Sequence, residues 1–166
     1  TVYSFLIPIA RLTAHFFQCS EKEQIMLKKL WCNMMVADVN KAIEFYADVL
    51  GFQHVMSVPM GSEEVLFQHD RNKVLVYALI KNGDIELMLQ EQKSLRENIP
   101  AFADSADISS SAVLYFEVDD LETLAARLKT QCEVVRDLHD TFYGMKEFYV
   151  KDLNGYVLGF AQPAAR

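Results

Sequence analysis

The sequence predicts an α+β protein in which a strand–helix–strand–strand–strand (βαβββ) module occurs twice. Residues 36–39 (Val-Ala-Asp-Val) match 118–121 (Val-Asp-Asp-Leu), and the apolar residues that follow each segment have the same helical spacing without a gap. An Asn-Gly pair then occurs in each half, at 82–83 and at 154–155. Three matches in the same order indicate an internal duplication. One module is too small to bury its sheet alone, so two modules, or two chains, must share a face.

The first module is predicted over residues 30–91. An apolar, strand-like segment at 30–36 leads to Asp38, a good N-cap because its carboxylate can accept from the free N–H groups of a first helical turn. Apolar residues then recur at every third or fourth position, which predicts an amphipathic helix. Gly51 ends it, where a positive φ favours glycine. Three strands are expected next, at 52–58, 74–80 and 85–90.

Two strands of this module allow more detail. The continuous apolar run at 74–80 is typical of a strand covered on both faces. Asn82-Gly83 predicts a type I′ hairpin turn between this strand and the next. Alternation in that next strand places Glu86, Met88 and Gln90 on one face.

Residues 92–111 are predicted to be a linker with one short helix near 94–103, because Pro100 and a serine run break the pattern. The second module is predicted over 112–162. Its first strand precedes a helix that begins at Asp119-Asp120, and Asp119 and Glu122 have the spacing of a capping box. Strands are expected from 134, 146 and 156, with Asn154-Gly155 as a second hairpin turn.

Residues 1–29 are expected to form an extension outside the repeated core. Pro8, Arg11 and His15 interrupt its apolar residues, so no stretch reaches the ~18–20 residues of a membrane helix. It also lacks the basic leader and the cleavage site of a signal peptide. Residues 1–25 are either a dispensable tail or a segment that packs on a partner.

Charge and cysteine content narrow the function. The net charge of −7 over 166 residues argues against nucleic-acid binding, which needs clustered Lys and Arg. An acidic surface suits a cationic ligand, but it also simply aids solubility. Cys19, Cys32 and Cys132 provide neither a disulfide framework nor a Cys-x-x-Cys site. They predict a reducing cytoplasmic location, with Cys32 and Cys132 as small apolar residues near the core.

Two motifs resemble those of a known superfamily. Residues 35–46 followed by 49–52 (Val-Leu-Gly-Phe) resemble the opening of a vicinal-oxygen-chelate domain, and 152–156 (Asp-Leu-Asn-Gly-Tyr) resembles its closing stretch. This superfamily includes glyoxalase I, extradiol dioxygenases and bleomycin-resistance proteins. The resemblance covers 30–162 and implies a concave mixed sheet built from the two modules. Because this fold hosts unrelated chemistries, it says less about activity.

Metal-dependent members take one His or Glu from the first and the last strand of each module, and the metal chelates two substrate oxygens. The resemblance places these ligand positions at Trp31, Glu86, Val113 and Gly159. Only Glu86 could coordinate a metal, and a shift of one residue offers only Cys32 and Leu158. The four histidines, His15, His54, His69 and His139, have no partner at ligand spacing and are expected on the surface or in loops. The sequence therefore predicts no metal and no cofactor, as in the non-metal, bleomycin-resistance-like branch.

Strand alternation suggests which residues could line a groove. Trp31 and Tyr115 could stack on a flat or cationic ligand, and Glu86 could pair with a cation. Structural alternatives exist: Trp31 could belong to the core, Met88 could fill a gap, Glu86 could pair with a lysine, and Tyr143 and Phe148 could simply close the second module. The predicted ligand-binding residues are Trp31, Asn33, Glu86, Met88, Tyr115, Tyr143 and Phe148, and no catalytic residue is predicted.

The favoured function is binding rather than catalysis. We expect a small-molecule binding protein that sequesters a cationic or aromatic compound without metal and so confers antibiotic resistance. The resemblance also implies a homodimer, without nucleic acid or membrane partners. One alternative is a metal-dependent lyase, isomerase or dioxygenase with a displaced site that includes Glu86, and another is a scaffold without a pocket. The ligand, and whether the modules pair within one chain or across a dimer, are left open.

Overall fold

The computed structural model describes residues 27–103, 108 and 111–164. The described residues from Trp31 onwards belong to one compact unit. The predictions for residues 1–25, for Cys19 and for His15 lie outside the described residues. Among the described residues, no helix has the length and apolar character needed to cross a membrane.

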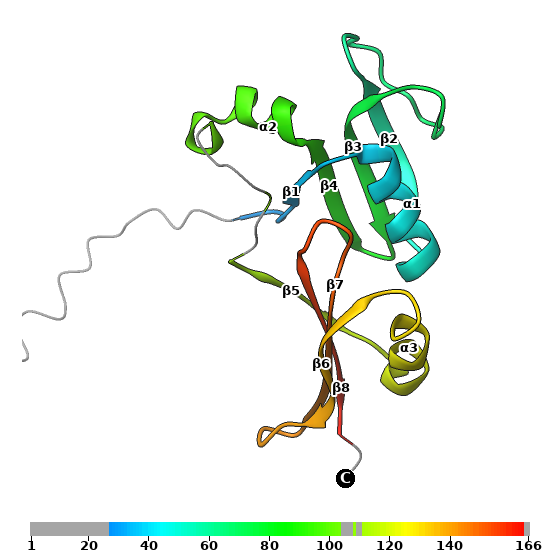
Figure 1. The fold of residues 1–166 in the computed structure, drawn as a ribbon, viewed down its shortest axis with the longest axis vertical. Coiled ribbons are helices and arrows are strands. Elements are labelled where there is room, and N and C mark those ends of the chain that lie inside the picture. Colours follow the sequence, from blue (N-terminus) through cyan, green and yellow to red (C-terminus); the bar gives the residue numbers. More distant parts are fainter. Residues whose placement is uncertain (1–26, 104–107, 109–110, 165–166) are drawn as a thin grey trace, which may run out of the picture. The chain divides into compact units, whose positions relative to one another are not determined.

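The order of elements confirms the predicted α+β fold with two βαβββ modules (Figure 1). A short helix, α2 (Gln92–Asn98), and a 3-10 turn (Pro100–Phe102) lie between the modules, where one short helix was expected. The first module consists of β1 (Cys32–Val36), α1 (Val39–Leu50), β2 (Gln53–Pro59), β3 (Leu75–Asn82) and β4 (Ile85–Glu91). The second consists of β5 (Val113–Glu117), α3 (Leu121–Leu128), β6 (Glu133–Asp140), β7 (Met145–Lys151) and β8 (Val157–Pro163).

Each module forms its own four-stranded mixed sheet, in the orders β1-β4-β3-β2 and β5-β8-β7-β6. In each, the first and last strands of the module pair in parallel and the other pairs are antiparallel. The expectation that β3 is covered on both faces is only half right. Leu75, Ala78 and Ile80 are buried, whereas the side chains between them remain partly exposed.

The turn between β3 and β4 differs from the predicted type I′ turn. Asn82 pairs with Ile85, so the two turn residues are Gly83 and Asp84 rather than Asn82 and Gly83. Gly83 has φ 57°, and Asp84 does not adopt a positive φ. This is the requirement of a type II′ turn, which needs glycine only at its first central position.

The second Asn-Gly pair lies in a longer connection, so the predicted second hairpin turn is also wrong. Lys151 pairs with Val157, which leaves residues 152–156, here called the β7–β8 loop, between the strands. Asp152 Oδ1 accepts hydrogen bonds from the N–H groups of Asn154 (2.9 Å) and Tyr156 (2.8 Å). The Asp152 carboxylate therefore organises a wide loop from within.

Capping of the helices follows the repeat. Asp38 caps α1 through Lys41 N–H, and Gly51 ends the helix with φ 72°, both as predicted. Asp120 caps α3 through Thr123 N–H. The predicted capping box of Asp119 and Glu122 is therefore wrong, because the cap lies one residue later and the Glu122 carboxylate bonds Lys146 Nζ (2.6 Å) instead.

Buried residues of both modules form one apolar core, and Cys32 and Cys132 pack at its edge as predicted. The β7–β8 loop joins the modules. Its Asn154 Oδ1 accepts from Ala37 N–H (3.0 Å), and the Tyr156 hydroxyl lies 3.1 Å from both the N and the O of Met35. The Tyr46 hydroxyl on α1 donates to Asp152 Oδ2 (2.9 Å).

Candidate functional site: a carboxylate bound by three tyrosines

Strand β7 carries a carboxylate on the face of the second sheet that is turned away from the core. Phe148 and Val150 point into the core and are fully buried, so Glu147 and Tyr149 lie on the opposite face. Glu147 is nevertheless only 3% exposed. A carboxylate shielded in this way needs partners, because an unpaired buried charge is very costly.

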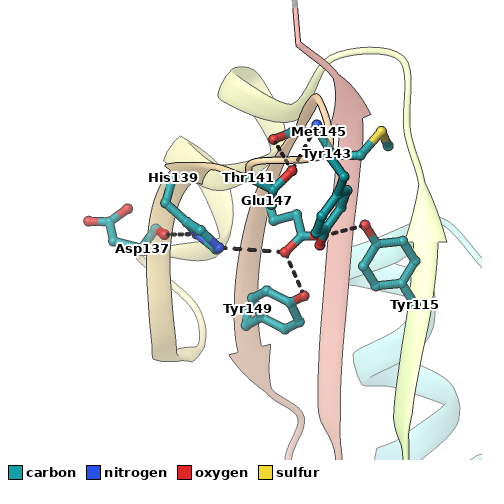
Figure 2. A network of polar contacts seen from close by, with 8 residues as sticks. All are labelled: Tyr115, Asp137, His139, Thr141, Tyr143, Met145, Glu147 and Tyr149. Atoms are coloured by element: carbon teal, nitrogen blue, oxygen red, sulfur yellow. Dashed lines mark hydrogen bonds and ion pairs between the residues drawn. The ribbon is translucent and has the colours of Figure 1, made fainter.

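Three phenols and one imidazole surround this carboxylate (Figure 2). Glu147 Oε1 accepts from the hydroxyls of Tyr115 (2.7 Å) and Tyr143 (2.5 Å). Glu147 Oε2 accepts from the Tyr149 hydroxyl (2.8 Å), and His139 Nε2 lies 3.5 Å from the same oxygen. We call these five residues the tyrosine–carboxylate cluster.

A glycine makes room for two of the rings. Gly159 on β8 pairs with Tyr115 on one side and with Tyr149 on the other. A Cβ atom at Gly159 would lie 2.7 Å from Tyr149 Cε1 and 3.1 Å from Tyr115 Cδ2, which is too close. A glycine inside a strand often marks such a close approach. Only glycine at this position lets both rings lie over β8 and reach Glu147.

The third tyrosine comes from the connection between β6 and β7. Thr141 fixes this connection by hydrogen bonds in both directions: its Oγ1 accepts from Met145 N–H, and its N–H donates to Met145 O. Gly144 has φ 84°, a value that glycine adopts without strain. The turn thereby directs the Tyr143 ring back onto Glu147 (Figure 2).

The hydrogen bonds determine the charge state of the cluster. Burial alone would raise the pKa of Glu147, but the three phenol donors outweigh it and lower that pKa. Burial and the bond to Glu147 raise the pKa of Tyr149 to about 12 and also raise the pKa values of Tyr115 and Tyr143. At neutral pH the cluster therefore holds one ionised carboxylate and three protonated phenols.

His139 has a defined orientation. Its Nδ1 lies 2.9 Å from the carbonyl oxygen of Asp137, so Nδ1 carries a proton and donates. The ring stacks on Tyr149 with centroids 6.1 Å apart and turns Nε2 towards Glu147. The expectation of a loop or surface histidine is wrong here, because His139 lies in β6 and is largely covered. His54 and His69 also contact each other, with stacked rings 5.6 Å apart.

In the first module the structure brings two predicted site residues together. Trp31 Nε1 donates to Glu86 Oε2 (2.6 Å), and Lys81 Nζ lies 3.9 Å from Glu86 Oε1. Asn33 Nδ2 donates to Gln90 Oε1 (2.8 Å). Met88 pairs with Asn33 in the sheet and is half-buried.

The remaining predicted residues lie in the second module. Tyr115 and Tyr143 belong to the cluster, whereas Phe148 is fully buried on the other side of β7 and cannot reach a ligand there. The sequence reasoning missed Glu147, Tyr149 and His139. Alternation in β7 was the available signal, since it places Glu147 and Tyr149 on the same face, opposite Phe148 and Val150.

The four ligand positions suggested by the resemblance do not fit a chelated metal. Glu86 accepts a hydrogen bond from Trp31, and the side chains of Val113 and Gly159 have no atom that can coordinate a metal. The space over Gly159, where a ligand side chain would lie, holds the rings of Tyr115 and Tyr149. Within the described ranges, no three side chains of His, Cys, Asp or Glu converge.

Comparisons with known proteins agree with this fold. Residues 29–160 match the family model of the Glyoxalase/Bleomycin resistance protein/Dioxygenase superfamily. None of the curated proteins matches the chain. Among solved structures, similar ones include TioX from Micromonospora sp. ML1 (TM-score 0.58, 15% identity, 82% of this chain and 99% of that one). A hypothetical protein, SA1046 from S. aureus, is also similar (TM-score 0.61, 20% identity, 84% of this chain and 96% of that one). So is a glyoxalase/bleomycin resistance protein/dioxygenase from Nocardioides (TM-score 0.60, 16% identity, 84% of this chain and 87% of that one).

Proposed function

Because this chain belongs to the glyoxalase/bleomycin resistance protein/dioxygenase superfamily, we propose that it is a small-molecule binding protein of the non-metal, bleomycin-resistance-like type. The proposed ligand is a small organic cation, bound over the tyrosine–carboxylate cluster. The observation that carries this proposal is the ionised Glu147 beneath two exposed rings, Tyr115 and Tyr143.

Exposure of the rings supports a binding surface. Tyr115 is 48% exposed and Tyr143 is 57% exposed, although both hydroxyls are engaged. Aromatic rings attract cations to their faces. A phenol that donates to a carboxylate is polarised by it, which makes its ring a better partner for a cation. The cation would lie on the Tyr115 side, because the positive charge of Arg136 acts on Tyr143 and Tyr149.

The same geometry argues against catalysis by Glu147. An efficient general base has a pKa near the working pH, whereas the pKa of Glu147 is lowered below its usual value. Three phenols also occupy its oxygens. The alternative of a metal-dependent enzyme built on Glu86 has no support in the donor set, since Glu86 bonds Trp31 and lies near Lys81.

Calorimetric titration tests this proposal. We expect benzyltrimethylammonium and choline to bind, and 3,3-dimethylbutan-1-ol, the neutral analogue of choline, to bind much more weakly. Tyr115→Leu should weaken cation binding by about two- to fivefold, the size of an exposed cation–ring contact. Phe67→Leu, at an exposed aromatic residue of the first module, is the matched control and should change nothing. Equal affinity for choline and its neutral analogue would refute the proposal.

The role in antibiotic resistance and the homodimer remain predictions. If a cationic drug is the ligand, cells that express the chain should tolerate more of it, and Tyr115→Leu should reduce that tolerance. Light scattering at several concentrations would determine whether two chains associate.

A further inference from the structure

A cavity lies where the two modules meet, and none of the five residues of the tyrosine–carboxylate cluster lines it. It has a volume of about 400 Å³. Phe52 and Ile85 of the first module and Phe116 and Leu124 of the second contribute apolar side chains to its wall. The end of β5 and the segment that joins it to α3 contribute carboxylates to the lining, and Arg127 of α3 contributes a guanidinium. The internal repeat indicates what this cavity can hold.

The internal repeat relates this cavity, at the β5–α3 junction of the second module, to the β1–α1 junction of the first module, where side chains of the β7–β8 loop fill the corresponding space. Asp38 and Asp120 cap the helices of their modules, and the alignment that pairs them also pairs Met35 with Glu117. In the first module, the β1–α1 junction is covered by the β7–β8 loop. The Tyr156 hydroxyl lies 3.1 Å from the N and the O of Met35. The side-chain oxygen of Asn154, in the same loop, accepts a hydrogen bond from Ala37 N–H.

The equivalent β5–α3 junction lacks such a cover. The β3–β4 turn that faces it consists of only Gly83 and Asp84, whereas the β7–β8 loop spans residues 152–156. No described residue of the β3–β4 turn hydrogen-bonds to the β5–α3 junction. The shorter turn therefore leaves open the space that Asn154 and Tyr156 fill on the other side.

The edge of β5 provides the matching polar groups. Val118 N–H donates to Ala161 O on β8. Peptide groups alternate in direction along a strand, so those of Glu117, the last residue of β5, point away from β8. Asp119 follows the strand and is the counterpart of Ala37 in the alignment of the two modules. The corresponding groups of Met35 and Ala37 are the ones that the β7–β8 loop binds.

We propose that this cavity binds a small aromatic molecule with a phenolic hydroxyl and an amide carbonyl. The ring lies among the apolar side chains, as Tyr156 does against the core. The hydroxyl pairs with the peptide groups of Glu117, and the carbonyl accepts from Asp119 N–H. The carboxylates of Glu117, Asp119 and Asp120 outnumber the guanidinium of Arg127 among the residues that line the cavity, which favours neutral or cationic molecules and disfavours acids.

An NMR titration of the ¹⁵N-labelled protein with N-acetyl-L-tyrosinamide tests this proposal. We expect saturable shifts of the Glu117 and Asp119 amides, with a Kd on the order of 1 mM. N-acetyl-L-phenylalaninamide, which lacks the hydroxyl, and N-acetyl-L-tyrosine, which carries a carboxylate, should bind several-fold more weakly. Glu147→Gln should leave these shifts unchanged, which separates this site from the proposed function.

Two variants close the cavity in different ways. Leu124→Trp should fill it and abolish the shifts, whereas Met60→Trp at an exposed position of the first module should not. Replacing Gly83 and Asp84 with Asp-Leu-Asn-Gly-Tyr, the sequence of the β7–β8 loop, should also abolish binding and should raise the melting temperature. The proposal is overturned if the phenol and its phenyl analogue shift the same amides equally. It is also overturned if the shifts persist in either folded variant, or if no titratable shifts occur.

Discussion

Replacing the carboxylate of Glu147 by an amide tests the central feature of the second module. In Glu147→Gln the side chain keeps its shape, but its nitrogen donates hydrogen bonds and cannot accept them. Three phenols donate to Glu147 in the native protein. At least one of them must lose its acceptor in the variant.

The size of the loss follows from how well each phenol is shielded. A hydrogen bond to a charged group contributes about 1.5–3 kcal/mol. Tyr115 and Tyr143 are about half exposed and can turn to water, whereas Tyr149 is more covered. We therefore count one bond rather than three and expect Glu147→Gln to lower the free energy of unfolding by about 2 kcal/mol at neutral pH.

Urea unfolding at several pH values measures this effect. The pKa of Glu147 is lower in the folded protein than in the unfolded chain. Its stabilisation is therefore present above the unfolded pKa of about 4.3 and is lost as the pH falls through the folded value. The difference between the native protein and Glu147→Gln should shrink on acidification. Glu133→Gln, which removes an exposed pair with Lys151, is the control and should have an effect close to zero.

Two results would refute this reasoning. If Glu147→Gln is as stable as the native protein at neutral pH, the phenols do not depend on the charge. If the difference between them grows as the pH falls, the carboxylate is destabilised rather than stabilised in the fold.

Three further predictions concern single residues. Gly159→Ala should destabilise the protein by about 1–3 kcal/mol by overpacking and by much less in a Tyr149→Ala background. A double-mutant cycle in urea measures both losses of unfolding free energy, and equal losses in the two backgrounds would contradict the close approach of the Tyr149 ring to Gly159. Burial raises the pKa of Asp152, so its stabilisation is complete below the unfolded pKa and is lost as the pH rises through the folded one. The melting temperature of Asp152→Asn should therefore rise relative to that of the native protein as the pH increases. A difference in melting temperature that does not change with pH would contradict this. Asp38→Ala should cost about 1 kcal/mol through loss of the α1 cap, and an unchanged urea midpoint would exclude that role.

The sequence was sufficient to predict the fold because the repeated features are local. Asp38 and Gly51 determine the ends of α1 through hydrogen bonds within a few residues. The errors arose where the same dipeptide has different neighbours. Gly83 completes a two-residue turn, whereas Gly155 lies in a loop that the Asp152 carboxylate holds open. Two Asn-Gly pairs look alike in sequence, and side-chain hydrogen bonding separates them.

The tyrosine–carboxylate cluster was harder to predict because its residues come from three strands and a turn. Tyr115 lies on β5 and His139 on β6, and register alone brings them to the same carboxylate. No sequence motif singles out Glu147 as a buried carboxylate, since an acidic residue in a strand is normally exposed. Gly159 was recognised only as a position without a ligand side chain, although its missing Cβ is what admits the rings.

The two modules share what builds the fold and differ where ligands could bind. Both keep a capping aspartate after the first strand. In the second sheet the space over Gly159 holds tyrosine rings that converge on Glu147. The connections differ as well: one junction is covered by Tyr156, and the other opens into a cavity. A duplicated chain keeps the groups that both copies need in order to fold, and each copy can change the rest independently. Departures from the internal symmetry are therefore the places in this chain where binding is best sought.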